Sequence, residues 1–104
     1  MQAADFEGLL RAFSSRGIRF IIIGGVSAAL QGVPTVTFDL DLVLEQEKDN
    51  LDQAFEELLQ LEAVFREHLP KCMLPERKGL ERAGAMLLMT RLGPLDLLGE
   101  VATG

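Results

Sequence analysis

The feature that most constrains this chain is a run of alternating side chains at residues 36–44. Its odd-numbered positions include two acids, Asp39 and Asp41. Its even-numbered positions from residue 38 onward are apolar: Phe38, Leu40, Leu42 and Leu44. Because successive side chains of a β-strand point to opposite faces, the run predicts a strand with one apolar face for a core and one face that carries neighbouring carboxylates.

Two amphipathic helices are predicted, one before and one after this strand in the sequence. The apolar residues of the first fall at helical spacing: Phe6, Leu9, Leu10 and Phe13. Gly17 is well placed to end this helix. The second helix is predicted at residues 51–59, with Asn50 and Gln53 as a capping pair at its start.

The remaining segments predict a short helix and three more strands. Residues 18–23 are rich in β-branched and aromatic side chains, which favours a buried strand. Residues 27–31 predict a short helix. Two further strands are predicted at residues 85–90 and 95–98, joined by residues 91–94 as a hairpin connection.

This order of elements predicts an α+β fold with two layers. We expect a mixed β-sheet of about four strands with the helices packed on one face. A chain of 104 residues can bury one core but not two. Residues 1–104 are therefore expected to form a single domain.

Composition excludes several classes of protein. A hydrophobic share of 48% excludes a disordered chain, and a net charge of −6 argues against a broad basic surface for nucleic acid. No apolar stretch approaches the roughly 20 residues of a membrane span, and the N-terminus lacks the pattern of a signal peptide. The single cysteine, Cys72, allows no internal disulfide. We therefore expect a cytoplasmic protein.

Three acids are candidate metal ligands. Asp39 and Asp41 lie two apart on the predicted strand, and Asp96 lies between Leu95 and Leu97, where a core strand rarely carries an acid. If the two strands are neighbours, the three carboxylates converge on a site suited to hard divalent cations. The alternative is that Asp39 and Asp41 line a solvated face and that Asp96 is a turn acid.

A glycine pair adds to this pattern. Gly24 and Gly25 follow an apolar strand and precede a helix, which lets backbone amides approach an anion. Together with the paired acids, the segments Ile23-Gly24-Gly25-Val26-Ser27 and Phe38-Asp39-Leu40-Asp41-Leu42 resemble the signature of the nucleotidyltransferase superfamily, which has the DNA polymerase beta-like fold. The resemblance is to the bacterial Gly-Gly…Asp-x-Asp subgroup of small or toxin/antitoxin-type members. Residues 90–98 resemble the hairpin that bears the third acid.

The resemblance implies an activity and a cofactor. The activity is metal-dependent transfer of a nucleotidyl group from a nucleoside triphosphate to a hydroxyl acceptor. Asp39, Asp41 and Asp96 would hold Mg²⁺ in a two-metal site, and Asp96 would help to activate the acceptor hydroxyl. The acceptor stays open between a protein side chain, a transfer RNA end and a small alcohol.

The resemblance also implies a nucleotide-binding role for three residues near the turn. Gly24 and Gly25 would contact the triphosphate, with Ser27 as a weaker candidate. Arg91 is the best of the exposed cations for binding the nucleotide.

An alternative function and a question of assembly remain open. Thr35 stands where relatives of this subgroup commonly carry an arginine, which favours a non-catalytic nucleotide-binding or protein-interaction module that keeps the fold. Most family members continue into helices after the third acid. The apolar residues at the C-terminal end of this chain therefore predict either a homodimer or a missing C-terminal helical extension.

Overall fold

The computed structural model describes residues 4–23, 40–68, 71–81 and 84–99. The described helices are α1 (Phe6–Ser15) and α3 (Lys48–Gln60), with two short 3-10 helices, η1 (Arg66–His68) and η2 (Arg77–Leu80). The described strands are β1 (Phe20–Ile23), β2 (Leu40–Leu44), β3 (Val64–Phe65), β4 (Ala85–Thr90) and β5 (Gly93–Leu98). The helix predicted at residues 27–31 lies outside the described residues, as does the first part of the strand predicted at 36–44.

The strands form one mixed sheet in the order β1-β2-β5-β4-β3. β2 and β5 run parallel, and the other neighbouring pairs are antiparallel. The mixed sheet confirms the α+β prediction. The sheet has five strands rather than about four, because β3 is two residues long and too short to leave a periodic pattern in the sequence.

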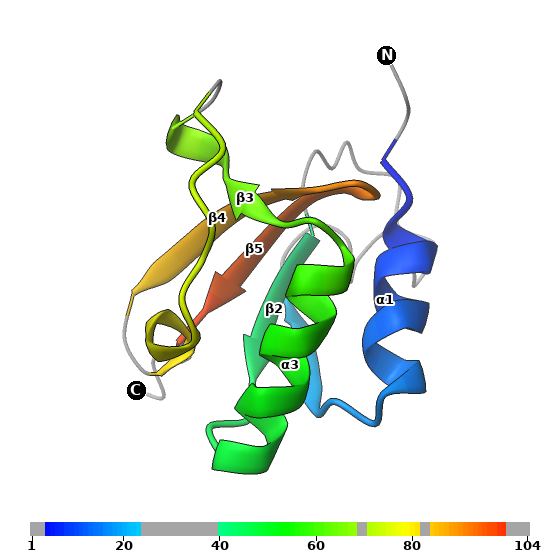
Figure 1. Cartoon of the computed structure of the whole chain (residues 1–104). Coiled ribbons are helices and arrows are strands. Elements are labelled where there is room, and N and C mark those ends of the chain that lie inside the picture. Colours follow the sequence, from blue (N-terminus) through cyan, green and yellow to red (C-terminus); the bar gives the residue numbers. More distant parts are fainter. Residues whose placement is uncertain (1–3, 24–39, 69–70, 82–83, 100–104) are drawn as a thin grey trace.

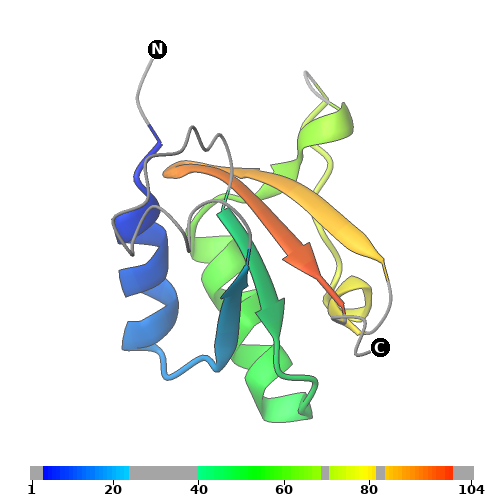
Figure 2. The ribbon, with the colours of Figure 1, turned by 180° about the vertical axis from the view of Figure 1, so that it is seen from behind.

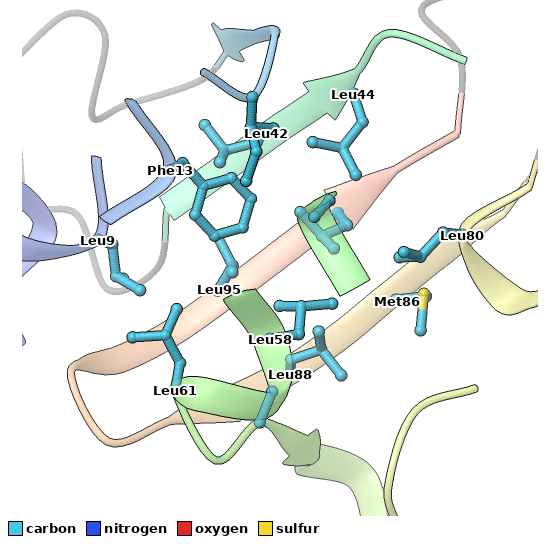
Figure 3. Close-up of a cluster of buried hydrophobic side chains, with 14 of the residues drawn as sticks. Leu9, Phe13, Leu42, Leu44, Leu58, Leu61, Leu80, Met86, Leu88 and Leu95 are labelled. Carbon is cyan, nitrogen blue, oxygen red and sulfur yellow. The ribbon is translucent and has the colours of Figure 1, made fainter. Parts of the chain in front are cut away.

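Helices α1 and α3 lie together on one face of the sheet, as Figures 1 and 2 show from opposite sides. The core lies between the helices and the apolar residues of β2, β4 and β5 (Figure 3). Its largest fully buried side chains are Phe13, Leu9, Leu40, Leu42, Leu58, Leu61, Leu88 and Leu95. Leu40, Leu42 and Leu44 are all buried, so the apolar side of the alternating run faces the core as predicted.

The first helix begins and ends with recognisable signals. At its start, the backbone N–H of Gly8 donates to Oδ1 of Asp5 at 2.8 Å, which satisfies one of the amides that a helix leaves unpaired. At its end, Gly17 has a φ of +72°, a conformation that favours glycine. The predicted helix and its stop at Gly17 are confirmed, and the chain turns directly into β1.

The predicted capping pair of the second helix is wrong. The helix begins at Lys48, three residues before the predicted start, and its N-cap, Glu47, makes no side-chain cap hydrogen bond. Asn50 is buried and instead joins the helix to the residues that precede β1 and follow β2. Its Oδ1 accepts from the N–H of Arg19 at 2.7 Å, and its Nδ2 donates to the carbonyls of Arg19 and Glu45, each at 2.9 Å. The position of Asn50 at the start of a helix suggested a cap, but its side-chain amide makes hydrogen bonds to residues outside the helix.

The predicted hairpin is present with a shorter connection. β4 spans Ala85–Thr90 as predicted, and only Arg91 and Leu92 lie between it and β5. Gly93 and Pro94 belong to β5 rather than to the turn. Gly93 has a φ of +131°, and an added Cβ there would lie 2.8 Å from the Cβ of Ala4. Glycine therefore fits both the backbone and the space at the start of β5.

Candidate functional site

The parallel pairing of β2 with β5 brings two of the predicted acids together. In the register of these strands, Asp41 lies opposite Asp96. Neighbouring strands are about 4.8 Å apart, and directly opposite residues point to the same face. Asp41 and Asp96, which are far apart in sequence, therefore form a carboxylate pair at the centre of the sheet.

This pair lies on the face of the sheet that α1 and α3 do not cover. Leu40 and Leu42 flank Asp41 and point into the core, and Leu95 and Leu97 do the same beside Asp96. Because side chains alternate along a strand, the two acids project to the opposite face. Figure 2 views the sheet from that side, with α3 behind the strands.

The neighbours of the pair across the sheet are apolar. Ile23 lies opposite Asp41 on β1, and Leu87 lies opposite Asp96 on β4. Asp41 is half-buried and Asp96 is only 8% exposed. Burying an ionised carboxylate among apolar side chains is costly unless a cation or a hydrogen-bond donor compensates it. Two adjacent carboxylates in this setting therefore call for positive charge nearby.

Arg66 supplies positive charge at this site. Its Nη2 lies 2.9 Å from Oδ1 of Asp96, and the two side chains are 27% and 11% exposed. Its Nη1 donates to the backbone carbonyl of Leu88 on β4 at 3.0 Å. The arginine follows directly after β3, so its guanidinium spans β4 to reach the acid on β5. This contact gives the site a largely buried ion pair.

Arg66 is a site residue that the sequence alone did not indicate. The apolar residues Ala63, Val64 and Phe65 before it are a short run that is compatible with a strand. No pattern in the sequence, however, indicates which strand this run joins. Only the place of β3 at the edge beside β4 shows that the arginine reaches Asp96.

Several predicted site residues lie outside the described part of the chain. These are Gly24, Gly25, Ser27 and Asp39. Ile23, the last described residue before the glycine pair, lies opposite Asp41. Within the described residues, no group of three or more acidic, histidine or cysteine side chains could hold a metal ion. The metal site stays a prediction that needs Asp39 as a further ligand.

Arg91 makes its observed contacts on the helix side of the sheet. Its backbone N–H donates to the carbonyl of Leu61 at 2.9 Å, and its Nε donates to the carbonyl of Gln60 at 3.4 Å. These contacts join the β4–β5 turn to the end of α3. Its predicted role in nucleotide binding stays a prediction, with this structural role beside it.

Comparisons with known proteins add no relative. No family model matches the chain, and no curated protein or solved structure is significantly similar to it. Among the described residues, neither α-helix has the length and apolar character needed to cross a membrane. The function must therefore be argued from the carboxylate pair and its surroundings.

Proposed function

We propose that this chain is a nucleotidyltransferase-like domain that transfers a nucleoside monophosphate from a nucleoside triphosphate to a hydroxyl acceptor, with Mg²⁺ as cofactor. The observation that carries the proposal is the pairing of Asp41 with Asp96 on neighbouring parallel strands. Carboxylate oxygens are the ligands that Mg²⁺ prefers, and this pair lies on the face of the sheet that α1 and α3 do not cover. The two carboxylates suit the proposed cation chemically, and Asp39 would be the further ligand that the site needs.

Each acid has a separate task in the proposed reaction. Asp41, with Asp39, would hold Mg²⁺, and the Gly24-Gly25 turn would contact the triphosphate. Asp96 would share in metal binding and would accept the proton of the acceptor hydroxyl. The hydroxyl oxygen would bond to the α-phosphorus as pyrophosphate leaves. Mg²⁺, when bound, would neutralise the charge that develops on the phosphate oxygens. The rigid sheet would contribute mainly by positioning the reactants.

The proposal is tested by thermal stability with ligands. A ligand that binds only the folded state at 100 times its Kd stabilises that state by about 2.7 kcal/mol. We expect at least one of the four nucleoside triphosphates to raise the melting temperature in Mg²⁺ and not in EDTA. Pyrophosphate release then reports transfer. The absence of a Mg²⁺-dependent shift with all four nucleotides would contradict the proposal.

A second function is favoured by the Arg66–Asp96 ion pair. Because a protein cation already neutralises Asp96, the fold is also compatible with a non-catalytic nucleotide-binding or protein-interaction module. A nucleotide-binding module would show the thermal shift without pyrophosphate release. A protein-interaction module would show neither.

A further inference from the structure

We infer that Arg66 is an anion-binding residue of the proposed site, and that it exchanges Asp96 for a phosphate group of the substrate when a divalent cation binds. The inference rests on the proposed function, because it assumes that Asp41 and Asp96 bind the cation. It adds a residue that the resemblance did not indicate. It also explains why an arginine pairs with one of the two neighbouring carboxylates.

The charges of the three described side chains support an exchange. Asp41, Asp96 and Arg66 together carry a formal net charge of −1. A divalent cation between the carboxylates changes the net charge of the group to +1. The cation competes with the guanidinium for Asp96, because both are attracted to the same carboxylate. The loaded site would then attract an anion to Arg66.

The geometry of Arg66 leaves it able to bind that anion. A guanidinium has five N–H donors, and the contacts made by Arg66 within the described residues use Nη1 and Nη2. The bond from Nη1 to the Leu88 carbonyl would hold the group beside the sheet during the exchange. A planar guanidinium matches the oxygens of a phosphate with two parallel hydrogen bonds. The side chain is 27% exposed, so an anion has access to it.

The test measures the binding of two probes to the wild type and to Arg66→Met. The probes are Mn²⁺ alone and inorganic tripolyphosphate in the presence of Mg²⁺, each followed by calorimetry. Removing the competing positive charge should tighten Mn²⁺ binding by about tenfold. Removing the phosphate-binding fork should weaken tripolyphosphate binding by about tenfold. A residue that only maintains the fold would move both affinities in the same direction.

Two more variants keep the result interpretable. Arg66→Lys keeps the charge without the planar fork, so Mn²⁺ affinity should stay within about twofold of the wild type while tripolyphosphate binding weakens. Arg77→Met is the matched control. Arg77 is also 27% exposed and also pairs with a carboxylate, that of Asp52, at 2.7 Å. Asp52 belongs to α3, on the other face of the sheet, so neither probe should bind differently.

The outcomes separate the two proposals. Opposite changes in the two affinities for Arg66→Met, with Arg77→Met unchanged, support the exchange. Binding of Mn²⁺ by the wild type, with both affinities of Arg66→Met unchanged or moved in one direction, overturns the inference and leaves the proposed function standing. A wild type that binds no Mn²⁺ overturns both. If Arg66→Met does not fold, Arg66→Lys decides, and unchanged tripolyphosphate binding in that variant overturns the inference.

Discussion

Asp41 and Asp96 differ in what surrounds them. Asp96 is buried and has the Arg66 guanidinium 2.9 Å away, whereas Asp41 is half-buried on the next strand with Ile23 beside it. Like charges on directly opposite positions of a sheet destabilise it. Removing the charge of Asp41 therefore removes one of two neighbouring like charges, together with a ligand that the proposed reaction needs.

Asp41→Asn should therefore separate activity from stability. We expect Mg²⁺-dependent nucleotide transfer to fall at least a hundredfold, because a neutral amide holds a divalent cation poorly. The protein should stay folded, because the amide has nearly the shape of the carboxylate that it replaces. Pyrophosphate release and urea denaturation measure the two effects. Undiminished transfer in both Asp41→Asn and Asp39→Asn would rule out the metal assignment.

At the scale of single residues, the sequence predicted the acids better than their partner. The alternation of residues 38–44 indicated that Asp41 lies opposite the core face, and that pattern is set by local backbone geometry. The ion pair of Arg66 with Asp96 depends on the order of strands in the sheet. Strand order follows from contacts between distant segments, which no local pattern encodes.

At the scale of elements, the start of α3 is fixed by Asn50 rather than by a cap. The amide of Asn50 makes three hydrogen bonds, to the N–H and carbonyl of Arg19 and to the carbonyl of Glu45. These bonds connect the helix to the segments that flank β1 and β2. The long periodic elements were predicted because their apolar stripes are local, but this connection and the two-residue β3 were not.

Asn50→Ala should lower the free energy of unfolding by about 2–3 kcal/mol, because it removes three part-buried hydrogen bonds. Asn50→Asp should not restore the loss, since a carboxylate cannot donate to the two carbonyls. Gln53→Ala is the control on the same helix, at an exposed position, and should change stability by less than about 0.5 kcal/mol. Urea denaturation measures all three. Equal losses in Asn50→Ala and Gln53→Ala would contradict this role of Asn50.

The ion pair between α3 and η2 gives a pH dependence. Hydrogen bonds from Arg77 and then from Lys48 hold the pKa of Asp52 below its ordinary value. A lowered folded-state pKa contributes stability above the unfolded pKa of about 3.9, and this stability is lost as the pH falls through the folded-state value. Wild type should therefore lose more stability than Asp52→Asn between about pH 5 and pH 3. Parallel curves for the two proteins in thermal unfolding over this range would refute this. The difference will be small, because the pair is solvent-exposed.

At the scale of the whole molecule, the two faces of the sheet have different tasks. α1 and α3 cover one face, and their apolar residues form the core together with those of that face, as Figures 1 and 3 show. The other face carries the carboxylate pair, with Ile21 and Val43 side by side in the adjacent row. The fold therefore separates stability from the proposed chemistry, since substitutions on the second face leave the main core intact.

The edge of this second face leads to the prediction that the chain forms a homodimer. Among the described strands, β1 pairs with β2 alone, and its Ile21 is 61% exposed. An apolar edge strand is a template for pairing with another chain. Ile21→Lys should therefore shift the protein from dimer to monomer in sedimentation velocity at micromolar concentration. Leu74→Lys, at an equally exposed position of 63% in a loop, should leave the dimer intact. A wild type that sediments as a monomer, or dissociation by Leu74→Lys alone, would exclude β1 as the interface.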